Sequence, residues 1–146
     1  MLLRALTLIP LGRPSVASHT WVVSLLASYF VASRDQADAI SRGERPSNVI
    51  LEDGPPLLPT DLGDLQRRIM GRESWSLIGQ RNEEWLVRVG DDFAAKIASL
   101  PDPIGDDVTD ELQLSADEVD VVEIMRPLAV RASSRTGSAL YILITL

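Results

Sequence analysis

The chain of 146 residues has no cysteine and a single histidine, His19. Without cysteine it can form no disulfide, no thiolate metal site and no cysteine nucleophile. With one histidine it has no metal-ligand spacing, and a Ser-His-Asp triad would have to recruit His19, which lies in an N-terminal segment with little domain character. We therefore predict no catalytic triad, no metal site and no cofactor.

Motifs for other chemistries are absent as well. There is no glycine-rich phosphate loop and no G-x-S-x-G turn. Residues 106–117 are acidic but lack the Asp-x-Asp-x-Asp-Gly ladder of a calcium loop. Carboxylate pairs such as Glu83 with Glu84 and Asp91 with Asp92 suit acid–base chemistry, yet 21 acidic residues make such pairs unavoidable. These absences favour a protein that is not an enzyme. The alternative is a small cofactor-independent enzyme that uses carboxylate and serine residues.

Apolar runs are short, and none has the length of about twenty residues that a membrane span needs. The stretch Trp21–Ala32 has twelve residues. With Arg4 and Arg13 before it and Val31-Ala32-Ser33 at its end, it has the features of a secretory signal with a cleavage site. On that interpretation the protein is secreted.

We favour a second interpretation, in which Ser24–Ala32 is the first strand of a cytoplasmic protein. Both faces of this strand are largely apolar, as in a central strand that is covered on both sides. Residues 1–20, which Pro10 and Pro14 interrupt, are then a flexible extension or a mis-assigned start. Residues 21–146 form a single globular domain.

Periodicity, capping patterns and chain breakers predict the remaining elements. Ser33 with Gln36, and Ser115 with Glu118, have the spacing of a capping box at the start of a helix. Pro127 predicts a kink or a restart within the last helix. Segments 52–59 and 72–84 are predicted to be irregular, and 102–114 to be an acidic linker. The predicted helices are 34–42, about 60–70, a helix that Asp91 or Asp92 caps and that runs to about 100, and 116–134. The predicted strands are 48–51, 84–89 and 138–146.

The strands near the two ends of the domain, 24–32 and 138–146, are apolar on both faces. Such strands lie in the middle of a sheet that has helices packed against it. The sequence therefore predicts an α/β or α+β fold, a single small domain with one sheet of about three to five strands.

The charge is distributed unevenly. Residues 1–73 carry eight basic and eight acidic residues, whereas residues 74–146 carry six and thirteen, which accounts for the whole net charge of −7. The excess is concentrated in residues 102–123, which have nine acidic residues and no basic one. A negative chain argues against binding to nucleic acid, which requires basic patches that neutralise phosphates.

Two interpretations of the acidic segment are open: a solvated helix face with its leading loop, or a docking surface for a basic protein partner. On the second, we expect Asp106, Asp107, Asp110 and Glu111 to contact the partner. Trp75 is the expected anchor, because tryptophan is frequent at binding hot spots. The predicted function is a non-enzymatic interaction or regulatory protein, with an immunity-type role as one form of it.

The order of elements from Trp85 onward carries a resemblance. A strand is followed by the helix Asp92-Phe93-Ala94-Ala95-Lys96-Ile97-Ala98-Ser99-Leu100, an acidic linker, a long helix and the strand opening Gly137-Ser138-Ala139-Leu140-Tyr141. With the strand and short helix at Tyr29–Ile40, this order resembles a group of uncharacterised small bacterial α/β proteins, of the domain-of-unknown-function kind. The chain departs from that pattern in having Ile142 and Leu143 where a tryptophan is expected. The resemblance implies a fold, but no activity and no functional residue.

Overall fold

The computed structural model describes residues 25–146, which fold into five strands and five helices. The predicted extension over 1–20, with His19, lies outside the described residues. In chain order the elements are β1 (Leu26–Ser33), α3 (Arg34–Ser41), β2 (Glu52–Gly54), α4 (Pro59–Met70), β3 (Trp75–Arg81), β4 (Glu84–Val89), α5 (Asp91–Ala98), α6 (Asp106–Leu112), α7 (Ala116–Ser133) and β5 (Ser138–Thr145).

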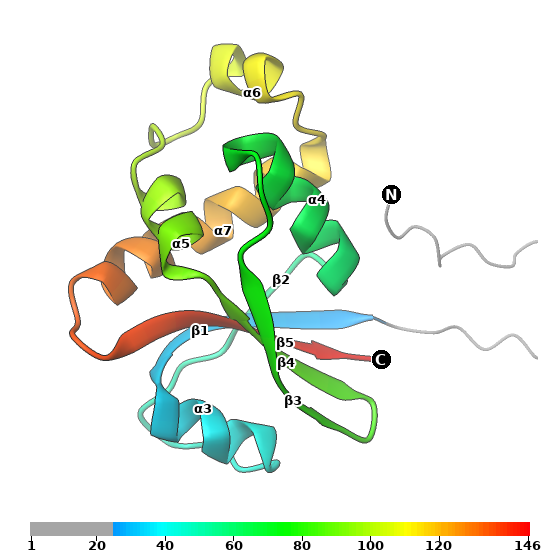
Figure 1. The fold of residues 1–146 in the computed structure, drawn as a ribbon, viewed down its shortest axis with the longest axis vertical. Coiled ribbons are helices and arrows are strands. Elements are labelled where there is room, and N and C mark those ends of the chain that lie inside the picture. Colours follow the sequence, from blue (N-terminus) through cyan, green and yellow to red (C-terminus); the bar gives the residue numbers. More distant parts are fainter. Residues whose placement is uncertain (1–24) are drawn as a thin grey trace, which may run out of the picture.

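The strands form one antiparallel sheet in the order β2-β1-β5-β4-β3, with β1 and β5 near its middle (Figure 1). β1 and β5 pair along their whole length, from Leu26 opposite Thr145 to Ser33 opposite Ser138. All residues of β5 between its two ends are buried. The prediction of one sheet with apolar central strands is confirmed. Because all strand pairs are antiparallel, the fold is α+β rather than α/β.

Helices cover the two faces of the sheet unequally. Figure 1 shows α4, α5 and α7 on one side of the sheet and α3 alone on the other. The larger core, between the sheet and the three helices, contains Phe93 and Met125. The smaller core, beneath α3, contains Ile40 and Tyr141, and the Tyr141 ring stacks on Phe30 with the ring centroids 5.5 Å apart.

Two helices begin as the capping patterns predict. The Ser33 hydroxyl accepts a hydrogen bond from the Gln36 backbone N–H at 3.2 Å, and the Gln36 side chain accepts one from the Ser33 N–H at 2.8 Å. Ser115 and Glu118 exchange the same two bonds at the start of α7. Each box satisfies backbone donors that have no partner within the helix.

The predicted strand at 48–51 and the predicted irregular segment at 52–59 are wrong about where the strand lies in the sequence. The chain does not pair over 48–51; it forms β2 at Glu52–Gly54, within the segment predicted to be irregular, opposite Ala27–Tyr29 of β1. Val49 is instead buried in the smaller core and Leu51 packs against it, whereas Ile50 is exposed. Gly54 fits its position because a Cβ there would collide with the side chains of Tyr29 and Ile124.

The prediction that 72–84 is irregular is also wrong, because the segment contains β3. β3 pairs with β4 and forms an edge of the sheet. A bulge between Leu77 and Gly79 shifts the register of this pair. The extra residue interrupts the alternation of inward and outward side chains, which removes the period by which a strand is recognised.

The start of α5 differs from the prediction in its cap. Gly90, rather than Asp91 or Asp92, is the N-cap residue. The Asp92 carboxylate accepts a hydrogen bond from the Ser74 hydroxyl instead. Both aspartates lie in the first turn, where the positive end of the helix dipole favours negative charge.

α7 is a single helix of 18 residues that continues through Pro127, so the predicted restart is wrong. Pro127 itself is exposed. Met125 before it and Leu128 after it are fully buried, and this packing on both sides offsets the backbone hydrogen bond that proline removes. No helix within residues 25–146 is long and apolar enough to cross a membrane.

Candidate interaction surface

The acidic residues of 102–123 lie on α6, on the first turns of α7 and in the loop before α6. Figure 1 shows α6 at one end of the molecule, on the far side of α4 and α7 from the sheet. We call the nine residues the acidic surface; all are exposed except Glu118, which is half-buried. They are Asp102, Asp106, Asp107, Asp110, Glu111, Asp117, Glu118, Asp120 and Glu123.

The helix α6, which carries four of these residues, replaces the predicted linker. Gly105 is its N-cap, and the Thr109 hydroxyl donates to the Gly105 carbonyl at 3.0 Å. The helix ends at Gln113, which has a left-handed backbone with φ 57°. None of its own residues is buried, but Ile104 before it and Leu114 after it are. Val108 and Leu112 of α6 are half-buried against the larger core, so these two side chains and the two flanking residues together anchor the helix.

The four predicted contact residues on α6 share one short element. Asp106 and Asp107 lie in its first turn, and Asp110 and Glu111 follow within the next turn. All four are exposed, and none forms an ion pair with any other residue in 25–146. The structure therefore brings together four carboxylates that are not neutralised within the described chain.

Within residues 25–146, only two members of the acidic surface form an ion pair with arginine. Glu118 forms an ion pair with Arg68 of α4, and Asp102 forms one with Arg126 of α7 at 3.3 Å. The other seven form no ion pair with the described residues. Unpaired like charges on neighbouring turns give this end of the molecule a negative potential.

Trp75 lies on a different element from the four α6 residues. It opens β3 opposite Val89 of β4 and packs, partly buried, against the larger core. Its indole N–H donates to the Glu73 carboxylate at 3.0 Å. Trp75 thus combines a packed ring face with a polar edge at the rim of the sheet.

The carboxylates named for acid–base chemistry are mostly held by arginine. Glu84 pairs with Arg45 at 3.3 Å, and Asp91 pairs with Arg88 at 3.0 Å. Asp92 pairs with Arg72. These three carboxylates are thus already engaged with arginine side chains.

The pKa of Asp92 has a clear physical cause. The hydrogen bond from the Ser74 hydroxyl lowers the pKa of Asp92 below its usual value, and the Arg72 guanidinium and the Phe93 backbone N–H lower it further. The carboxylate therefore stays ionised well into acid. Its contacts tie the start of α5 to the segment before β3.

Two buried tyrosines have raised pKa values because burial disfavours the phenolate. The Tyr29 hydroxyl donates to the Pro55 carbonyl at 2.7 Å. Tyr141 lies beneath α3, where the nearby guanidinium of Arg88 opposes the effect of burial on its pKa. Both rings serve the packing of the sheet.

One buried polar residue, Gln66 of α4, was not predicted from the sequence; it is 0% exposed. Its amide nitrogen donates to the Ser74 carbonyl at 2.8 Å, and its amide oxygen accepts from the Ser74 N–H at 2.7 Å. Gln66 lies four residues after Leu62 and three before Ile69, so the helical spacing places it on the buried face of α4 and could have marked it. The α6 helix also had a sequence signal, because Gly105 precedes two aspartates and Val108 and Leu112 stand four residues apart.

Comparison of the chain with protein-family models, with curated proteins and with solved structures finds no significant match. Within residues 25–146, no three metal-ligating side chains gather closely enough to hold a metal ion. The geometry and charge of the described residues are therefore the basis for a functional argument.

Proposed function

We propose that the protein is a non-enzymatic interaction or regulatory protein that binds a basic protein partner through the acidic surface. The observation that carries the proposal is the set of seven unpaired carboxylates on two consecutive helices. Of the nine ion pairs among the described residues, seven lie outside this surface, and the other two engage Glu118 and Asp102. The surface is thus negative because its other seven carboxylates form no ion pair with any residue of 25–146.

A surface of this kind acts mainly on the rate of association. Complementary charges attract a partner before contact and orient it, which raises the association rate more than the final affinity. The contact residues of the proposal are Asp106, Asp107, Asp110 and Glu111, with Trp75 as an apolar anchor at the rim. Neutralisation of a basic toxin-like protein or regulation of a basic enzyme fits this mode of binding.

The experiment is affinity capture from cell extract with two matched variants, followed by mass spectrometry. The test variant carries Asp106→Asn, Asp107→Asn, Asp110→Asn and Glu111→Gln. The control changes the net charge equally with Asp35→Asn, Glu52→Gln, Asp53→Asn and Glu83→Gln, acids outside the acidic surface that form no ion pair within 25–146.

We expect the wild type and the control to retain a basic protein at low salt, and the test variant to lose it. Salt should release it as well, since the Debye length falls from about 10 Å at 0.1 M to about 3 Å at 1 M. Equal recovery with all three proteins, or recovery that salt does not affect, would overturn the proposal. A substitution of Trp75 by alanine tests the anchor separately.

A further inference from the structure

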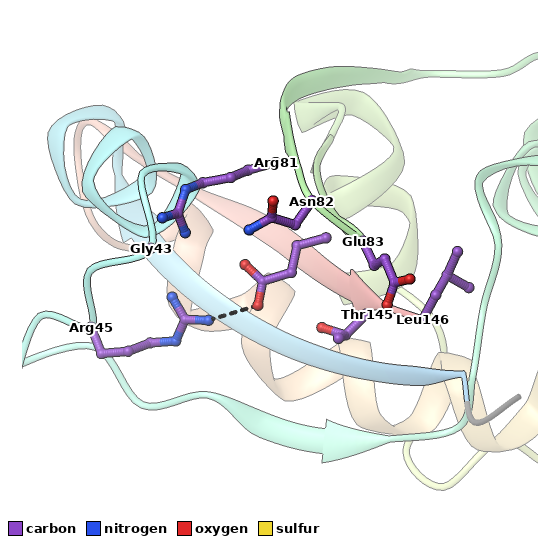
Figure 2. Close-up of a pocket in the computed structure, with 8 residues that line it drawn as sticks. Gly43, Arg45, Arg81, Asn82, Glu83, Thr145 and Leu146 are labelled. Carbon is purple, nitrogen blue, oxygen red and sulfur yellow. Dashed lines mark hydrogen bonds and ion pairs between the residues drawn. The ribbon is translucent and has the colours of Figure 1, made fainter.

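A polar pocket of about 650 Å³ lies away from the acidic surface, at the end of the sheet that the β3–β4 hairpin forms. Figure 2 shows the loop after α3, the hairpin and the end of β5 around it. The hairpin places four consecutive residues in the lining. The lining residues are Gly43, Arg45, Arg81, Asn82, Glu83, Glu84, Thr145 and Leu146.

The exposed Arg81 side chain has no partner for its charge within the part of the chain that the structure describes. It lies against Gly43, where φ is +93° and where a Cβ would collide with Nη1 of Arg81. Gly43 thus allows both the left-handed backbone and the close approach of the guanidinium. No residue of 25–146 accepts a hydrogen bond from Arg81 or forms an ion pair with it.

The carboxylate that could have neutralised Arg81 is engaged with another arginine. Glu84 forms its ion pair with Arg45 at 3.3 Å, and Figure 2 shows this pair crossing the pocket. Glu83 lies toward Thr145 and Leu146 in the same view, away from the Arg81 guanidinium. The end of the pocket next to Gly43 therefore keeps a positive charge in a protein whose net charge is −7.

Asn82 adds a neutral donor beside that charge. It has a left-handed backbone with φ 55°, which fixes the turn between β3 and β4. Figure 2 shows its side-chain amide reaching from the hairpin into the pocket on the Arg81 side. An amide N–H₂ group next to a guanidinium is a donor set suited to an oxygen-bearing anion, because the guanidinium binds two oxygens in one plane.

We propose that this pocket binds the carboxylate or phosphate group of a small molecule, with Arg81 as the main donor and Asn82 as the second. Arg45 forms the opposite wall, where its ion pair keeps Glu84 engaged. The inference is independent of the proposed docking function, because the two sites share no residue.

The test is an NMR titration of 15N-labelled protein with inorganic phosphate and, separately, with acetate, each against sodium chloride at equal ionic strength. We expect saturable shifts of the Gly43 and Asn82 amide signals. If only phosphate produces these shifts, the pocket binds a phosphate group; if only acetate does, it binds a carboxylate; if both do, it binds oxyanions in general. Shifts that do not saturate with either anion and match those caused by sodium chloride would overturn the proposal.

Two arginine variants complete the test. Arg81→Gln should weaken binding about tenfold, the loss expected for one charge-assisted hydrogen-bond pair. Arg135→Gln is the matched control, since Arg135 is also exposed and without an ion pair in the described chain, and it should leave the affinity unchanged. Affinity retained in Arg81→Gln would also contradict the proposal. The four-residue variant of α6 should bind the anion as the wild type does.

Discussion

Around Ser74 the polar groups have partners, whereas on the acidic surface most carboxylates form no ion pair with any residue that the structure describes. Gln66 binds both backbone groups of Ser74, and the Ser74 hydroxyl donates to Asp92, which also pairs with Arg72. On α6, four carboxylates face solvent, although they are chemically the same group as the partnered carboxylate of Asp92. The difference indicates that polar residues near Ser74 hold the fold together, while those of α6 are available to another molecule.

The largest effect should come from Gln66, because it is the buried member of the partnered region. Gln66→Ala removes its packing and leaves the Ser74 N–H without its acceptor, which should cost about 3 kcal/mol of unfolding free energy. Gln80→Ala, at an exposed position of β3, is the control and should stay within about 0.5 kcal/mol of the wild type. Urea denaturation measures the free energy of unfolding of both variants. A similar loss of stability for the two substitutions would contradict the structural role given to the hydrogen bonds of Gln66.

An intermediate effect is expected within the acidic surface itself, at Glu118. This carboxylate accepts from the Ser115 N–H and pairs with Arg68, whereas Asp120 on the same helix has no ion pair with the described residues. Glu118→Ala should therefore cost about 1 kcal/mol, the usual value of a capping interaction, in urea denaturation. Asp120→Ala should change the free energy of unfolding little. If it lowered the free energy of unfolding as much as Glu118→Ala does, the contacts of Glu118 would not explain a difference between the two carboxylates.

A pH effect should distinguish Asp92. Its pKa is lower in the folded chain than in the unfolded chain, so its contribution to stability is present above the unfolded pKa and is lost as the pH falls through the folded pKa. At pH 7 the wild type should be more stable than Asp92→Asn, and the gap should narrow once the pH falls below the unfolded pKa of aspartate, about 3.9, and through the lower folded pKa. Urea midpoints at several pH values measure the gap, and a gap that is constant with pH would contradict this origin.

The smallest effects are expected on α6, and they should have opposite signs. Asp106 and Asp107 lie at the positive end of the helix dipole, whereas Asp110 and Glu111 lie nearer its negative end. Asp106→Asn with Asp107→Asn should lower the urea midpoint slightly at low salt. Asp110→Asn with Glu111→Gln should raise it slightly, and high salt should remove both shifts. Shifts of the same sign would show that repulsion across the surface outweighs the dipole.

The sequence predicted those parts of the molecule where one local pattern determines the outcome. The capping boxes at Ser33 and Ser115 depend on four neighbouring residues, and the apolar character of β1 and β5 follows from their central place in the sheet. β3 was missed because its bulge interrupts the period of two, and β2 because its pairing depends on β1, which is distant in sequence.

The candidate sites divide in the same way. The acidic character of 102–123 is a property of composition, so the sequence alone locates it. The absence of ion pairs for seven of its members depends on which arginines α4 and α7 bring near. The pocket at Arg81 depends on a glycine and an arginine that are 38 positions apart in sequence and adjacent in the fold. Contacts of this kind have no local signature.

The most direct test of the account is the association rate of the captured basic partner, measured by stopped-flow fluorescence at ionic strengths from about 0.05 M to about 0.5 M. We predict that the rate for the wild type falls by about tenfold or more over this range, as electrostatic steering requires. For the variant with four neutralised residues on α6, the rate should be low at every ionic strength. A rate that is the same for the two proteins at low ionic strength would contradict the claim that the acidic surface is the docking site.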